Sequence, residues 1–136
     1  RWALQRYFPE MRSFLEIGCG TGVVLGAVAN AFPSAALTGS ELASGALGIA
    51  ARQVPGARFI QMDGRRIPYR DEFDVAGAFD VLEHIPDDRA VLKQLHGAIV
   101  TNGVLGAVCT VERGLIWTGL SLPIGGSLLA IARRRK

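Results

Sequence analysis

Residues 14–25 read FLEIGCGTGVVL, and this stretch decides the fold class. The apolar run at its start, interrupted by Glu16, is typical of a strand that is covered on both faces of a parallel sheet. Three glycines follow at alternate positions: Gly18, Gly20 and Gly22. Glycines permit a tight turn and let a ligand approach the main chain closely. A helical pattern that stops at Pro33 comes next, so a helix N-terminus presents free N–H groups at the glycine-rich turn.

The rest of the chain continues this alternation of strands and helices. Apolar strands are expected at 14–17, 36–39, 58–62, 73–79 and 104–111. Helical patterns are expected at 4–8, ended by Pro9, at 24–32, at 47–54 and at 88–101, the last capped by Asp87 or Asp88 and ended by Asn102-Gly103. The link 64–72 lacks a helical pattern. This order predicts an α/β fold with a parallel sheet, in which ligands bind beyond the carboxyl ends of the strands.

Composition places further limits on the class of protein. The chain has 136 residues, of which 49% are hydrophobic and 20% are charged, which fits one globular domain over 1–136. The net charge of +3 comes from the last four residues, because the remainder holds 11 basic and 12 acidic residues. No basic nucleic-acid-binding face is therefore expected.

Two cysteines, Cys19 and Cys109, make no disulfide framework, and no secretory signal is visible, so we expect a cytoplasmic location. The chain begins in a helix without Met, which suggests an excised domain.

Two residues indicate which ligand the glycine-rich turn binds. The dinucleotide fingerprint G-x-G-x-x-G requires glycine at position 23, where this chain has Val23. Glu41 ends the second strand, 19 residues after Gly22, where an acid can accept hydrogen bonds from both ribose hydroxyls of an adenosine cofactor. An adenosine cofactor is therefore expected, and Val23 disfavours the dinucleotide of a nicotinamide oxidoreductase.

Five segments resemble, in order and spacing, the motifs of class I S-adenosylmethionine-dependent methyltransferases, over about residues 1–111. They are FLEIGCGTGVVL (14–25), LTGSEL (37–42), ARFIQMDGRRIPY (57–69), FDVAGAFDVLEHIPD (73–87) and LKQLHGAIVTNGVLGAV (92–108). The fourth resembles the small-molecule branch, which includes ubiquinone-type O-methyltransferases. The resemblance implies a Rossmann-like three-layer αβα sandwich, with a mostly parallel twisted sheet and an antiparallel C-terminal strand.

By position, the resemblance also implies which residues bind S-adenosylmethionine and its product S-adenosylhomocysteine. These residues are Glu16, Gly18, Cys19, Gly20, Gly22, Glu41, Leu42, Met62, Asp63, Gly64 and Phe79. The glycines would line the methionine part, with the acid of the first strand behind them. Glu41 would hold the ribose hydroxyls, Asp63 would accept a hydrogen bond from the adenine amino group, and the backbone carbonyl of Phe79 would face the methionine amine. No metal site is predicted.

The reaction that this family implies is in-line transfer of a methyl group to a small-molecule acceptor. Much of the rate can come from positioning the acceptor against the activated methyl group, and a base is needed only if the acceptor is protonated. His84, just past the fourth strand, is the candidate base, and the alternative is that it only shapes the loop. Nucleic acid is not expected as the acceptor, because AFDV (78–81) stands where adenine methyltransferases have an Asn/Asp-Pro-Pro-aromatic sequence.

The segment after Val111 departs from the family pattern. A further helix and an antiparallel strand pair would need about 40–50 residues, whereas 25 remain. Residues 114–132 are uncharged and precede a basic end, so both a membrane helix and a terminal hairpin within 112–136 fit the sequence. Pro123 and the glycines weaken a helix, which favours the hairpin. The short acceptor region leaves a second function open: a cofactor-binding but catalytically impaired domain or partner subunit.

Overall fold

The computed structural model describes residues 2–99 of the chain. Strands and helices alternate in it as the sequence predicts. In chain order the elements are α1 (Trp2–Tyr7), β1 (Ser13–Ile17), α2 (Val23–Ala31), β2 (Ala36–Glu41), α3 (Ser44–Gln53), β3 (Arg58–Gln61), β4 (Val75–Ala78), the short 3₁₀ helix η1 (Leu82–His84) and α4 (Asp88–Ala98).

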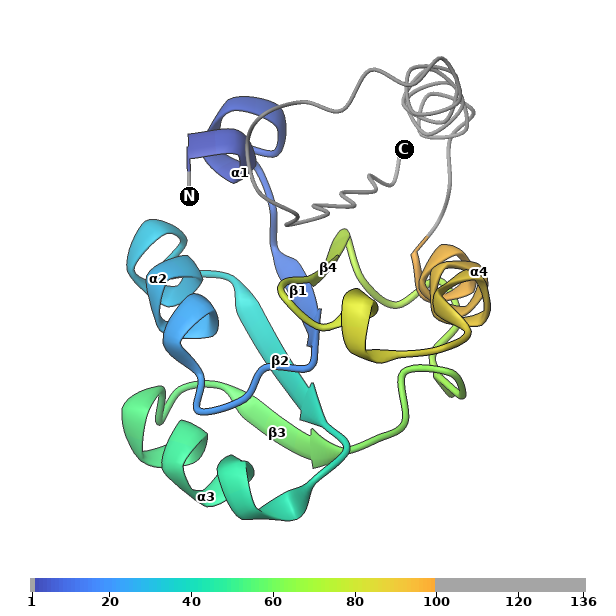
Figure 1. The fold of residues 1–136 in the computed structure, drawn as a ribbon. Coiled ribbons are helices and arrows are strands. Elements are labelled where there is room, and N and C mark those ends of the chain that lie inside the picture. Colours follow the sequence, from blue (N-terminus) through green and yellow to red (C-terminus); the bar gives the residue numbers. More distant parts are fainter. Residues whose placement is uncertain (1, 100–136) are drawn as a thin grey trace, which may run out of the picture.

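The four strands form one parallel sheet in the order β3-β2-β1-β4 (Figure 1). β1 lies in the interior of the sheet, where Leu15 pairs with Thr38 of β2 on one side and with Ala76 of β4 on the other. The chain winds from β1 out to β3 and then returns to place β4 on the other side of β1. This reversal is a topological switch point, where open α/β sheets bind ligands beyond the carboxyl ends of their strands.

The predicted α/β fold with a parallel sheet is confirmed for the described part of the chain. The predicted fifth strand (104–111), the antiparallel C-terminal strand and the hairpin within 112–136 lie outside the described residues. Within residues 2–99 no strand is antiparallel to its neighbours. In the same range, no helix combines the length and the apolar character that crossing a membrane requires.

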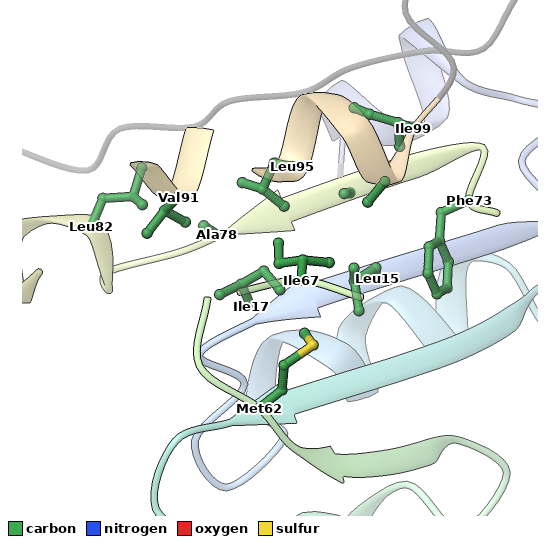
Figure 2. Close-up of a cluster of buried hydrophobic side chains, with 12 residues drawn as sticks. Leu15, Ile17, Met62, Ile67, Phe73, Ala78, Leu82, Val91, Leu95 and Ile99 are labelled. Carbon is green, nitrogen blue, oxygen red and sulfur yellow. The ribbon is translucent and has the colours of Figure 1, made fainter. Parts of the chain in front are cut away.

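Helices cover both faces of the sheet. Successive side chains of β1 point to opposite faces, so β1 contributes to a hydrophobic cluster on each face. Leu15 and Ile17 lie in a hydrophobic cluster with Val91 and Leu95 of α4 (Figure 2). Phe14 lies in a second cluster, with buried side chains of α1 and α2. Figure 1 accordingly shows α4 on the opposite side of the sheet from α2 and α3. β1 and β4 are thus buried on both sides, whereas β3 at the edge of the sheet is half-buried or exposed.

The predicted end of α4 is wrong. The helix begins as expected, with the Asp87 carboxylate accepting a hydrogen bond from a backbone N–H of the first turn at 3.0 Å. It ends at Ala98, however, and not at Asn102-Gly103. Ile99 has an extended backbone, is 2% exposed and forms a parallel bridge with Phe73, so core packing replaces the expected last turn. Phe73 lies outside β4, which spans Val75–Ala78 and is therefore shorter at both ends than the predicted strand 73–79.

Candidate functional site

The glycine-rich turn between β1 and α2 depends on left-handed backbone conformations. Gly18, Gly20 and Gly22 have φ angles of 71°, 51° and 87°, which favour glycine. Gly18 and Gly22 also need the space of a missing side chain, because a methyl group there would lie 2.5 Å from Val81 and 3.2 Å from Ala50, respectively. At Gly20, by contrast, no described atom lies within 4 Å of that position. The turn is therefore packed at its ends and open at Gly20, where a ligand can reach the main chain.

The Glu41 carboxylate at the end of β2 holds this turn in place. Its Oε2 accepts a hydrogen bond from the Gly20 N–H at 3.0 Å, and its Oε1 accepts one from the Leu42 N–H at 2.8 Å and a longer one from the Ala43 N–H at 3.5 Å. A carboxylate has about four acceptor positions, so capacity remains for other donors. Because Glu41 is only partly buried, this capacity can face a ligand.

Glu16 lies on β1, directly before the turn. It is 1% exposed, and its Oε2 has no hydrogen-bond partner among the described residues. Burial raises the pKa of this carboxyl from 4.5 to about 8. Its partners in the sheet register are Gly39 and Gly77. Burial and the negative charges of Glu16 and Glu41 raise the pKa of the Cys19 thiol to about 11.

The Asp63 carboxylate, after β3, is bound by a side chain that the sequence analysis did not single out. Its Oδ1 accepts hydrogen bonds from the Arg65 N–H and Nε at 2.9 and 3.0 Å, and its Oδ2 accepts one from Nη2 at 2.8 Å. These bonds lower the pKa of Asp63 from 3.8 to about 2. At neutral pH the group is therefore ionised and can only accept hydrogen bonds. The spacing of two residues permits this pairing, but in the sequence it looks like two solvated side chains.

A cavity of about 170 Å³ lies at the carboxyl ends of β1, β2 and β3, beside η1. Its wall consists of Ile17, Gly18, Glu41, Leu42, Met62, Asp63, Gly64, Arg65, Val81, His84, Ile85 and Pro86. The structure thus brings together predicted residues from separate segments of the chain, namely Gly18, Glu41, Leu42, Met62, Asp63, Gly64 and His84. The apolar residues of the η1 segment in this wall were not predicted, because apolar side chains after a strand look like ordinary core.

The other predicted residues lie beside this cavity and not in its wall. Glu16, Cys19, Gly20 and Gly22 form or underlie the adjoining turn. Phe79 follows β4, and its ring packs against the main chain at Gly77, where a methyl group would lie 2.8 Å from the ring. The half-buried Phe79 ring therefore packs against the second hydrophobic cluster.

His84 is the last residue of η1 and is exposed at the cavity. Its backbone N–H donates a hydrogen bond to the Val81 carbonyl at 3.1 Å, which closes the short helix. The Val81 side chain, at the start of this turn, packs against Gly18. The imidazole is thus held at the mouth of the cavity, where both solvent and a second ligand can reach it.

A larger cavity of about 550 Å³ lies between α2 and α3. Its described lining includes Phe32, Pro33, Val54 and Pro55 and carries no charged side chain. None of the predicted site residues lines it. Ligand sites combine apolar walls with a few convergent polar groups, and of these two cavities the smaller one has them. We therefore assign the candidate site to the cavity at the strand ends.

A glycine-rich turn after β1, followed by acids after β2 and β3, is characteristic of Rossmann-like domains that bind an adenosine cofactor. A sequence family described as a methyltransferase domain matches residues 15–105, which is more than half of the chain. The chain belongs to the class I S-adenosylmethionine-dependent methyltransferase family.

Individual proteins that are similar to this chain are also methyltransferases. Trans-aconitate 2-methyltransferase from Variovorax paradoxus is 31% identical over 98 residues, which cover 71% of this chain and 38% of that protein. A ubiquinone biosynthesis O-methyltransferase from Histophilus somni is 26% identical, covering 69% and 43%. The S-adenosylmethionine-bound structure of CalS10, an amino pentose methyltransferase from Micromonospora echinaspora, has a TM-score of 0.66 and 27% identity over 74% of this chain and 44% of that chain. The chain spans about two fifths of the length of these relatives.

Proposed function

We propose that the chain binds S-adenosylmethionine at this cavity and forms the cofactor domain of a methyltransferase that acts on a small molecule. The observation that carries this proposal is the pair of acids at the glycine-rich turn. Glu41 binds the turn through the Gly20 N–H and lines the cavity, and Glu16 lies directly before the turn with a carboxyl oxygen that has no partner among residues 2–99. The Glu41 carboxylate suits a positively charged sulfonium cofactor, and a cation at the turn would also supply a partner for Glu16.

The cavity wall fits the adenosine end of this cofactor. Glu41 retains about one acceptor position for a ribose hydroxyl after it binds the turn. Leu42 is 61% exposed, so it offers apolar surface to adenine, and Met62 lies in the same wall. Asp63 would accept a hydrogen bond from the adenine amino group beside Gly64. Sites for drug-sized ligands measure about 300–1,000 Å³, so a cavity of about 170 Å³ would hold the adenosine end alone.

The methionine end would then lie along the turn, on the open side of Gly20. A buried carboxyl with an unpartnered oxygen is costly unless a donor or a cation reaches it. A cationic group near the turn would stabilise the ionised form of Glu16, and the backbone carbonyl of Phe79, after β4, would accept a hydrogen bond from an amine. Both features favour a cationic amino-acid moiety at this end of the site.

When bound, S-adenosylmethionine supplies an activated methyl group on sulfur, and the protein holds the acceptor in line with it. His84 lies at the cavity mouth, where it can remove a proton from an acceptor hydroxyl or amine. An acceptor that arrives deprotonated needs no base, and His84 then only shapes η1. The names of the relatives, a trans-aconitate 2-methyltransferase and a ubiquinone biosynthesis O-methyltransferase, support a small molecule as the acceptor.

Isothermal titration calorimetry on the purified chain tests the cofactor assignment. We expect binding of S-adenosylmethionine and S-adenosylhomocysteine, and no comparable binding of NAD. Binding of NAD without binding of S-adenosylhomocysteine would show that the proposal is wrong. Transfer of a labelled methyl group to a panel of hydroxyl, amino and carboxyl acceptors then tests turnover. Cofactor binding without transfer would favour the alternative, a cofactor-binding domain or partner subunit that does not itself catalyse.

A further inference from the structure

Asp63 and Arg65 form an ion pair in the wall of the cavity. The guanidinium Nε contacts both carboxylate oxygens, at 3.0 and 3.1 Å, and Nη2 contacts Oδ2 at 2.8 Å. The Arg65 backbone N–H adds a bond to Oδ1 at 2.9 Å. One residue therefore binds both oxygens of the carboxylate with its side chain and its main chain, which fixes the position and the rotation of the carboxylate.

The loop that carries this pair is also fixed. The Arg66 N–H donates a hydrogen bond to the Asp63 carbonyl at 2.8 Å, which closes the turn after Asp63. The negative charge of Asp87, at the start of α4, further favours the charged form of Arg65. The side chains are 27% exposed for Asp63 and 51% exposed for Arg65, so the pair borders both the cavity and solvent. A ligand in the cavity would meet a carboxylate that is already oriented.

We propose that Arg65 is a positioning residue through which the chain selects its purine: it orients the Asp63 carboxylate so that the cavity accepts a hydrogen-bond donor at purine C6 and rejects an acceptor there. This inference rests on the proposed function, because it requires the adenosine end to enter this cavity. An amino group at C6, as in adenine, donates to the carboxylate. A carbonyl oxygen at C6, as in hypoxanthine, would face the carboxylate as a second acceptor, and both groups would lose their bonds to water.

The guanidinium is needed because a solvent-bordering carboxylate on a loop can otherwise turn toward water. Lysine at position 65 would keep the positive charge, but its ammonium cannot bind both oxygens in one plane. Arg66 provides a matched control, since it acts on the Asp63 carboxyl through its charge and not through a side-chain hydrogen bond to it. Comparing these changes separates the effect of orientation from the effect of charge.

The test compares S-adenosylhomocysteine with S-inosylhomocysteine, which carries a carbonyl oxygen at purine C6, by calorimetry on the full chain. The unaltered chain should prefer the former by at least about tenfold. Arg65→Ala should weaken S-adenosylhomocysteine binding about fivefold and leave S-inosylhomocysteine binding within about twofold, and Arg65→Lys should do the same. Arg66→Ala should change neither. In an Asp63→Asn background, Arg65→Ala should have no further effect, because Arg65 acts through Asp63.

Two results would overturn this inference while leaving the proposed function intact. An equal loss of both ligands in Arg65→Ala would mean that Arg65 contacts another part of the cofactor or supports the fold, and circular dichroism distinguishes these two. Tighter binding of S-adenosylhomocysteine by Arg65→Ala would mean that Arg65 competes with adenine for Asp63. If the unaltered chain binds neither ligand, the proposed function is wrong and the inference is wrong with it.

Discussion

Replacing Glu41 with alanine removes the carboxylate at the point where β2 meets the glycine-rich turn. Three of its roughly four acceptor positions hold the Gly20, Leu42 and Ala43 N–H groups at 3.0, 2.8 and 3.5 Å, and the remaining one would accept a hydrogen bond from a ribose hydroxyl of the proposed cofactor. A hydrogen bond to a charged group contributes about 1.5–3 kcal/mol. At about 1.4 kcal/mol per factor of ten, Glu41→Ala should weaken S-adenosylhomocysteine binding about 10- to 150-fold.

Calorimetry with S-adenosylhomocysteine measures this loss, and two variants define its cause. Glu41→Gln keeps one acceptor oxygen but points an amide N–H₂ at a backbone donor, so it should also bind more weakly than the parent. Glu10→Ala removes an exposed acid from the loop before β1, at the opposite end of the strands, and should bind like the parent. The fold should survive Glu41→Ala, because a half-exposed strand-end acid contributes little to the core. Binding of Glu41→Ala within twofold of the parent would refute the assignment of the ribose site to the end of β2.

Three further predictions concern the turn and the cavity mouth. Burial raises the pKa of Glu16 from 4.5 to about 8, so the folded state binds this proton more tightly than the unfolded state does. The free energy of unfolding should therefore fall by up to about 1.4 kcal/mol per pH unit as pH rises from 4.5 to 8. Urea unfolding at pH 5 and pH 8 should show this decrease, and Glu16→Gln should abolish it. Gly18→Ala should lower the free energy of unfolding by about 1–3 kcal/mol because of the clash with Val81. Gly20→Ala should lower it by about 1 kcal/mol and should mainly weaken cofactor binding. Equal effects of the two substitutions on stability would contradict the open position at Gly20. Where turnover is present, His84→Ala should reduce kcat about 100-fold or more with cofactor affinity kept if His84 is the base, and a loss of only a few-fold in a steady-state assay would leave it a structural role.

The strand ends and the residues that gather there could be predicted from the sequence because the physics is local. Hydrophobic patterns located the four strands of the described sheet, and parallel strands place their carboxyl ends at one edge. Residues as far apart as Gly18, Asp63 and His84 therefore meet at one cavity without any contact being visible in the sequence. The same reasoning places Gly20 and Glu41 together, and the 3.0 Å bond between them agrees with it.

What the sequence could not predict depends on tertiary contacts. The helical pattern of α4 continues to Asn102-Gly103, but the bridge between Ile99 and Phe73 ends the helix earlier. The pairing of Asp63 with Arg65 depends on how the loop after β3 turns, and two charged residues at this spacing are more often separately solvated. In both cases the local pattern permits several conformations, and packing against a distant segment or a neighbouring side chain selects one.

Glu16 and Glu41 show why the two ends of the site differ in what they require of a ligand. Glu41 is already bonded to main-chain N–H groups, so its carboxylate is stabilised before any ligand arrives. Glu16 is buried, its Oε2 has no hydrogen-bond partner within residues 2–99, and burial favours its neutral form. An unsatisfied buried carboxyl destabilises a fold, and such groups are found mainly where function requires them. A cation bound at the turn would both supply the missing partner and lower the pKa of Glu16. Cofactor affinity should therefore increase as pH rises toward 8, while the stability of the free protein decreases over the same range.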